Sequence, residues 1–322
     1  VTGVQTCALP ICWLLCALAV AAAAQDYPTR PLRLVVGFPP GGGADGAARA
    51  VAQKLNDAWG QPVIVDNRAG AGGNVGTEVG ARAVPDGHTL TIGSTSTYIT
   101  NVALEPKLPF DPRRDFAPIA LIVTAPNILV VHPSLSAANT SEFIALARSS
   151  VKKLNFSSFG DGSSSHLVAE MFKRAAGADM VHVPYKGGGP ALAAVMGGEV
   201  PATFANLSVA LPQVKGGKVR GVAVTSARRA TLLPDTPTVA ESLTGFEATS
   251  SVGLLAPAGT PRALVLQIHR DLHAVVDEPR MREQFIARGF EMALSTPEEF
   301  TRYIRTEIPR WSKVVRDAGL NK

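Results

Sequence analysis

Apolar runs that end in glycine-rich loops recur along this chain, and they constrain its fold more than any other feature. Residues 32–38 form a nearly continuous apolar run that leads into the glycines at 41–43. A helical segment follows, with small and apolar residues on one face, namely Ala48, Val51, Ala52 and Leu55. A strand that is apolar on both faces is typical of a parallel sheet covered by helices. The pattern predicts an α/β fold with mostly parallel strands.

The same order of strand, loop and helix returns along the chain and starts afresh after residue 126. Ala125-Pro126 is expected to break one apolar stretch into two strands. We expect strands at 32–38, 62–66, 88–93, 119–123, 127–132, 154–158, 180–184, 200–205 and 219–225. This repetition predicts two Rossmann-like halves.

The composition excludes several classes of protein. Of the 322 residues, 46% are apolar and only 18% are charged, so the chain is not expected to be disordered. The 31 Lys and Arg against 26 Asp and Glu leave a net charge of +5. This mild excess is spread along the chain, so we expect no nucleic-acid partner.

Residues 1–24 carry no charged side chain, and we expect them to be the remnant of a signal peptide. The segment 13–24 is apolar and ends in Ala22-Ala23-Ala24, the small-x-small pattern of a cleavage site, so cleavage is expected near Ala24. Residues 1–11 resemble the translation of a sequencing-library adapter and are expected to be an artefact. An unusual native N-terminus is the alternative.

Cleavage near Ala24 would remove every cysteine of the chain, since Cys7, Cys12 and Cys16 all precede it. The exported protein would then have no thiol nucleophile, disulfide or cysteine-zinc site. No other segment reaches the ~18 continuous apolar residues of a membrane helix. We therefore expect an exported, soluble protein.

The first glycine loop admits more than one interpretation. Residues 41–46 match G-x-G-x-x-G, and Asp66 follows at the spacing of a dinucleotide fingerprint. The prolines at 39–40 argue against it, because they lengthen the turn where the fingerprint places its first glycine at the strand end. The loop is expected to be a tight turn in which Asp45 caps the helix. It could also present bare N–H groups to an anion at the helix N-terminus.

The second half repeats this device with a loop of glycine and serine at 160–165. Neither loop contains Arg or Lys, and only Lys186 is expected near the cleft. Binding is therefore expected to use N–H and hydroxyl donors, with bridging water, rather than an arginine clamp. A loop that meets only solvent is the alternative.

Catalytic and metal-binding motifs are weak. Residues 162–166 depart from G-x-S-x-G, because His166 stands where a glycine is required. His269 and His273 have a zinc-like spacing but lack the glutamate of H-E-x-x-H, so an exposed pair is expected. His166 either caps a helix or binds a ligand. We expect no catalytic residue, metal or cofactor; a secreted α/β hydrolase that uses His166 with a serine is the alternative.

Seven short segments together resemble a known family. They are 37–49 (GFPPGGGADGAAR), 67–76 (NRAGAGGNVG), 85–87 (PDG), 182–187 (HVPYKG), 216–226 (GGKVRGVAVTS), 237–241 (PTVAE) and 255–261 (LAPAGTP). In this order and spacing they resemble the exported substrate-binding proteins of tripartite tricarboxylate transporters, the Bug family. The resemblance extends from residue 27 to residue 319.

The resemblance implies a periplasmic binding protein of type II, a Venus-flytrap with two interdomain crossovers. Domain 1 would comprise residues 25–123 plus 251–322, and domain 2 residues 124–250. A small carboxylate would be the ligand and the membrane transporter subunits the partner of a monomer in the periplasm. A sensor that reports to a membrane signalling partner is the alternative.

The resemblance also implies the ligand-binding residues. They are Phe38, Gly41, Asp45, Gly72, Gly73, Ser94 and Thr95 in the first half, and Gly160, Ser163, Ser164, His166, Tyr185 and Asn206 in the second. The chain departs from the family where Ser250, Ser251 and Val252 replace a frequent tryptophan, and where Pro201 and Ala205 replace polar residues. These departures bear on the class of ligand more than on the fold.

Overall fold

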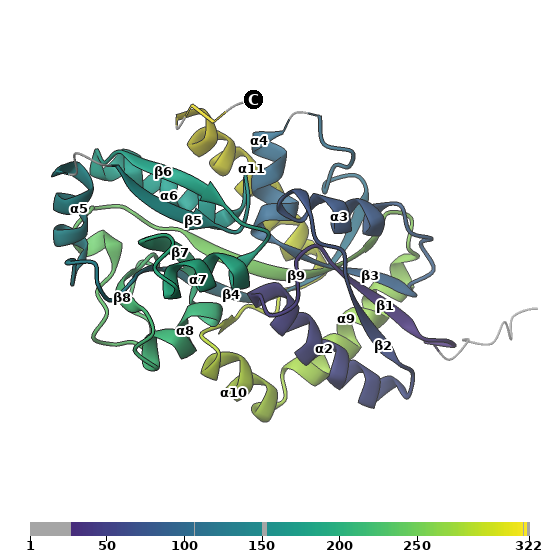
Figure 1. The fold of residues 1–322 in the computed structure, drawn as a ribbon. Helices are drawn as coiled ribbons and strands as arrows, with labels where there is room; N and C mark the ends of the chain where they lie inside the picture. The colour runs from purple at the N-terminus through teal and green to yellow at the C-terminus, as the bar shows by residue number, and fades with distance from the viewer. Residues whose placement is uncertain (1–26, 106, 150–152, 318, 321–322) are drawn as a thin grey trace, which may run out of the picture.

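The computed structural model describes residues 27–105, 107–149, 153–317 and 319–320 (Figure 1). The expected signal-peptide remnant, its cleavage site and the adapter-like segment lie outside the described residues. Within the described part of the chain, no helix is long and apolar enough to cross a membrane.

The first half of the chain builds a parallel sheet with β1 between β2 and β3. Its elements are β1 (Leu32–Val36), α2 (Gly43–Trp59), β2 (Val63–Asn67), η1 (Ala71–Gly73), α3 (Asn74–Ala81), β3 (Thr89–Ser94), the π-helical turn η2 (Ser96–Thr100) and α4 (Asn101–Leu104). Each strand ends in the loop that starts the next helix. The glycine loops therefore lie at the carboxyl edge of the sheet, where open α/β sheets bind ligands.

The second half repeats this arrangement, with β5 parallel to both β6 and β7. Its elements are α5 (Thr140–Ser149), β5 (Leu154–Ser158), α6 (Ser164–Ala176), β6 (Met180–Pro184), α7 (Gly188–Met196), β7 (Ala202–Asn206), α8 (Leu207–Lys215), β8 (Arg220–Val224) and η3 (Val239–Glu241). The α/β class expected from the sequence is confirmed.

Two long strands, β4 (Phe116–Val131) and β9 (Thr249–Pro257), join the halves. Figure 1 shows them passing between the purple half and the teal and green half. They run antiparallel to each other and to strands of both halves. The expectation of mostly parallel strands is therefore wrong for the sheet as a whole, because both connecting strands pair antiparallel with their neighbours. The strand order is β2-β1-β3-β9-β4-β7-β5-β6, and β8 and β10 (Glu291–Met292) also pair with β4.

The expected break at Ala125-Pro126 is wrong, because β4 continues through it. Pro126 is the last residue of β4 that pairs with β9, and Asn127 is the first that pairs with β7. Proline lacks the N–H that a strand donates to its neighbour. At the point where β4 exchanges one partner strand for another, that missing donor is tolerated.

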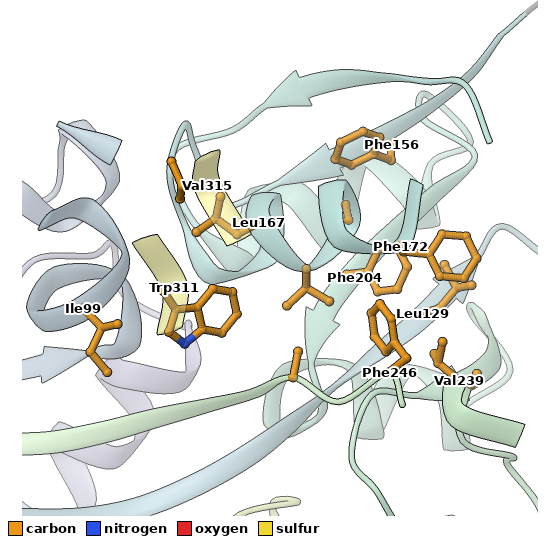
Figure 2. Close-up of a cluster of buried hydrophobic side chains, with 14 of the residues drawn as sticks. Ile99, Leu129, Phe156, Leu167, Phe172, Phe204, Val239, Phe246, Trp311 and Val315 are labelled. Atoms are coloured by element: carbon orange, nitrogen blue, oxygen red, sulfur yellow. The ribbon is translucent and has the colours of Figure 1, made fainter. Parts of the chain in front are cut away.

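The chain ends in three helices, α9 (Arg262–Val276), α10 (Pro279–Ala287) and α11 (Pro297–Asp317). Figure 2 shows Trp311 and Val315 of α11 in one cluster with Leu167 of α6 and with Ile99 of the first half. The rings of Tyr98 and Phe300 meet edge to face at 5.3 Å in the same cluster. Burying side chains of this size stabilises the fold by about 1.5–3 kcal/mol each. The last helix therefore ties both halves together.

Candidate functional site

Four helices begin at one cavity between the two halves. Its wall includes Gly43 of α2, Ser164 of α6, Gly188 of α7 and Ser208 of α8. The first N–H groups of a helix have no partner within the helix, and the helix dipole adds partial positive charge there. The cavity measures about 40 Å³, more than the roughly 10–15 Å³ that one water molecule needs. It has room for more than one water molecule, and the helix ends around it favour a negatively charged group.

Hydroxyl and phenyl groups complete this cavity. None of the described residues that line it has a charged side chain; they include Phe38, Ser94, Ser96, Phe159, Asn206, Ser250, Ser251 and Phe290. The Oγ atoms of Ser94 and Ser208 are buried, and neither has a hydrogen-bond partner among the described residues. Buried hydroxyls are normally paired. These two hydroxyls, one from each half, are therefore candidates for hydrogen bonds to a ligand.

The crossover strands add a polar network to the wall. Asn127 of β4 donates to Ser250 Oγ of β9 at 3.2 Å and accepts from Asn206 at 3.2 Å. Ser250 Oγ also donates to Ser164 Oγ at 3.2 Å. These contacts fix the orientation of Asn206 and Ser164, which both line the cavity. Ser250 therefore contacts Ser164 directly and is linked to Asn206 through Asn127.

Thr95 does not line the cavity but holds Ser251, which does. Its hydroxyl accepts from the amide of Ser251 at 2.7 Å and contacts Ser251 Oγ at 2.8 Å. Ser251 Oγ also contacts the hydroxyl of Tyr98 at 2.5 Å. Burial raises the pKa of the Tyr98 phenol well above its usual value, so this network stays protonated. Thr95 acts on the site through Ser251, which does line the cavity.

A larger cleft of about 320 Å³ adjoins the cavity, and Phe38 and Phe159 belong to both. The glycine loops form its walls, and it carries the charged side chains of Glu105, Asp161 and Lys186. Lys186 thus lies in the cleft, as the sequence suggested. Ligand groups that extend past the two phenyl rings would meet these charges.

The two halves touch across this region. Ser96 of η2 accepts the amide of Ser164 at 3.0 Å, and Thr100 donates to the carbonyl of Gly162 at 3.0 Å. Both bonds join the first half to the N-terminal end of α6 or to the loop before it. The two halves are therefore in direct contact beside the cavity in this structure.

Asp45 does not cap α2 as expected, because Gly42 occupies the N-cap position. Its carboxylate instead accepts from the amide of Gly41 at 2.9 Å, from Arg49 at 3.0 Å and from Asn67 at 2.9 Å. Burial would raise the pKa of Asp45, but these hydrogen bonds and the charge of Arg49 lower it overall. The carboxylate braces the glycine loop and is not part of the cavity wall.

His166 does not cap α6 either, since Ser163 accepts the amide of His166 at 3.3 Å. The ring Nδ1 of His166 accepts the amide of Gly162 at 3.1 Å. The ring is buried and lines neither the cavity nor the cleft.

One cluster has the residue types of a metal site, with ligand atoms of Asp161, His166 and His182 within 4.8 Å of one another. The two imidazole rings are stacked, however, with centroids 3.8 Å apart and planes 8° from parallel. Nitrogen lone pairs lie in the ring plane, so those of two parallel rings cannot converge on one ion. This geometry does not suit a metal.

The structure thus divides the expected ligand residues into three groups. Phe38, Ser94, Ser164 and Asn206 line the cavity; Phe38, Gly72, Gly73, Gly160 and Tyr185 line the cleft; Gly41, Asp45, Thr95, Ser163 and His166 line neither. Direct contact of any of them with a ligand stays a prediction. The sequence reasoning missed Ser96, Phe159, Ser208 and Phe290. Ser96 and Ser208 each follow a strand end within two residues, which is a signal too common to select them.

Comparison with known proteins extends these observations. Residues 47–320 match the model of the tripartite tricarboxylate transporter family receptor. BugT of Bordetella pertussis is 35% identical over 304 residues, which cover 94% of this chain and 93% of that protein. Among solved structures, an R. palustris protein with adipate is 34% identical with a TM-score of 0.89, covering 91% of this chain and 99% of its own.

MatC from Rhodopseudomonas palustris with bound malate is 33% identical with a TM-score of 0.86, and the match covers 90% of this chain and all of that one. The expected two-lobed binding-protein fold is confirmed by these matches, which extend over nearly the whole chain. The matched family consists of solute-binding receptors rather than enzymes. The chain belongs to the family of receptors of tripartite tricarboxylate transporters, as the resemblance of its glycine loops implied.

Proposed function

We propose that this chain captures a small carboxylate between its two halves and passes it to the membrane subunits of a tripartite tricarboxylate-type transporter. It acts in the periplasm as a monomer, after cleavage of a signal peptide near Ala24, and needs no cofactor. The two domains that close around the ligand are residues 25–123 plus 251–322 for the first, and residues 124–250 for the second.

The observation that carries this proposal is the uncharged cavity at which four helices begin. Helix N-termini favour anions through their N–H groups and dipoles. The hydroxyls of Ser94 and Ser208, which have no partner within the described part of the chain, add two donors from opposite halves. Related proteins solved with adipate and with malate support a carboxylate as the ligand class.

Closure follows from the placement of these donors. A carboxylate that accepts hydrogen bonds from both halves contacts the closed form more fully than an open one. Only such a difference in contacts shifts a conformational equilibrium toward the closed form. The membrane subunits would then recognise the closed, loaded receptor.

Titration calorimetry on the chain from residue 25 onward tests the ligand class, after unfolding and refolding to remove any carried ligand. The panel is malate, adipate, citrate and, as an uncharged control, glucose. At least one acid is expected to bind and glucose is not. Binding of glucose alone, or of none of the acids, would overturn the carboxylate assignment.

A further inference from the structure

We propose that His166 positions the ligand loop at residues 159–163 only while its Nδ1 is unprotonated, so that ligand capture weakens in mild acid. The proposal rests on the proposed function for its last step, the effect on the ligand. Its first step, the control of the loop by a proton, concerns the protein alone.

The hydrogen bond to Gly162 defines the state of the ring. An amide N–H can donate only to a ring nitrogen that carries no proton. Because Gly162 donates to Nδ1 at 3.1 Å, the neutral ring has its proton on Nε2. A proton added to the ring would occupy Nδ1 and place two N–H groups against each other. The contact that holds Gly162 would then be lost.

Gly162 connects this ring to the first half of the chain. Its carbonyl accepts from Thr100 of the first half at 3.0 Å. Gly160 and Asp161, in the same loop, line the cleft. A Cβ on Gly162 would lie 2.7 Å from Leu104 of the first half, so the loop is tightly confined. Displacing Gly162 would therefore disturb both the cleft wall and the contact between the halves.

The stacked ring of His182 limits how many protons the pair accepts. Its Nε2 contacts Ser158 Oγ at 2.5 Å and its Nδ1 lies 3.6 Å from Asp161. Burial lowers the pKa of His182, an effect that the charge of Asp161 opposes and that of Lys173 assists. Two imidazolium rings with centroids 3.8 Å apart would repel, so the pair takes up one proton well before a second.

Some charged groups around His166 and His182 favour protonation of the pair, and others oppose it. Glu170 lies 3.9 Å from Nε2 of His166 and favours its protonation. Lys173 binds Glu170 at 2.8 Å and stands 5.8 Å from the ring of Phe156, which packs beside both imidazoles. Asp161 favours a proton on His182. Glu170 and Asp161 therefore favour a proton on the pair, whereas burial of His182 and the charge of Lys173 oppose it.

The first experiment follows the ligand-free protein by NMR between about pH 7.5 and pH 5.5, the range in which histidines titrate. The amide proton of Gly162 is expected to shift with the same midpoint as the ring of His166. If the ring titrates while this amide remains unchanged, or if the ring stays neutral throughout, the proposal is wrong.

The second experiment uses a conservative pair of variants. His166→Ala removes the acceptor, whereas in His166→Asn the side-chain oxygen can accept the Gly162 amide but does not titrate. With malate and adipate as probes, His166→Ala is expected to weaken binding at neutral pH and His166→Asn to restore part of it. In the unchanged protein Kd should rise at least about threefold toward pH 5.5, since one bound proton can change affinity up to tenfold per pH unit. His166→Asn should abolish this rise.

His273→Asn is the matched control, because His273 is an exposed histidine of α9 away from the cleft. It should keep the pH dependence of the unchanged protein. An equal pH dependence in His166→Asn would overturn the proposal. If His166→Asn does not fold, His182→Gln tests the same pair, and removing the second stacked ring should raise the pH at which the Gly162 amide shifts. If neither acid binds at neutral pH, the carboxylate assignment fails, while the NMR titration still decides the role of His166.

Discussion

Gly72 and Asp161 bring the two glycine loops into backbone contact across the cleft. A Cβ at position 72 would stand 2.9 Å from the carbonyl oxygen of Asp161, closer than real Cβ atoms come to other atoms. Gly72 lies in η1, directly before α3, and Asp161 lies in the loop before α6. A backbone oxygen cannot rotate away as a side chain can. This approach of the two loops therefore needs a residue without a side chain at position 72.

Gly72→Ala is expected to hinder closure and to weaken binding of malate or adipate, whichever binds, by about 1–3 kcal/mol, the usual cost of overpacking. Gly217→Ala is the matched control. Gly217 has nearly the same positive φ, +66° against +62°, but open space around it. Both variants should lose about 1 kcal/mol of folding stability through backbone strain, and only Gly72→Ala should lose affinity. Calorimetry and chemical denaturation measure the two effects; equal affinities in the two variants would contradict the closure argument.

Ser94→Ala and Ser208→Ala are each expected to weaken ligand binding by about 0.5–1.5 kcal/mol, the net value of one neutral hydrogen bond. Folding stability should not fall, because neither hydroxyl has a partner among the described residues. Thr140→Val is the control, since the Thr140 hydroxyl is also buried, has no partner in the described structure and does not line the cavity. Unchanged affinity in both serine variants would remove these hydroxyls from the ligand site.

Lys186→Ala is expected to weaken binding by less than about 1.5 kcal/mol, because neutral donors surround the inner cavity and Lys186 lines only the outer cleft. Lys218 lines neither the cavity nor the cleft, so Lys218→Ala is the control for the loss of a surface charge. The test is calorimetry at low and moderate salt. A loss of several kcal/mol would identify Lys186 as the main partner of the carboxylate.

Asp45→Asn is expected to lower the stability of the protein at neutral pH by about 1.5–3 kcal/mol, the range for hydrogen bonds to a charged group. The pKa of Asp45 is lower in the folded than in the unfolded state, so its stabilising contribution is complete above about pH 4. It disappears as the pH falls through the lowered value. The stability difference between the two proteins should therefore shrink in acid.

Denaturant titrations at several pH values measure this difference. Asp179→Asn is the control, because Asp179 forms an exposed ion pair with Lys153 and such pairs contribute less than about 1 kcal/mol. A constant difference between Asp45→Asn and the unchanged protein across the acid range would show that the carboxylate charge does not brace the loop.

The strands and glycine loops could be predicted from local sequence, because a buried parallel strand needs an unbroken apolar run and its loop needs residues without bulky side chains. Pro126 shows the limit of this reasoning. A proline interrupts most strands. Pro126 is tolerated because β4 exchanges partner strands between Pro126 and Asn127. The neighbouring sequence does not determine which strand pairs with a given residue.

The sequence by itself determined the fold class, the two glycine loops and the family, and it pointed to Phe38, Ser94, Ser164 and Asn206, which line the cavity. Only the tertiary structure brought Ser208 and Ser250 to the same wall and turned Asp45 and His166 toward loop backbone. The physical reason is that the cavity forms where helices from distant parts of the chain begin. Strand pairing and core packing decide that convergence, and no local pattern of residue types encodes it.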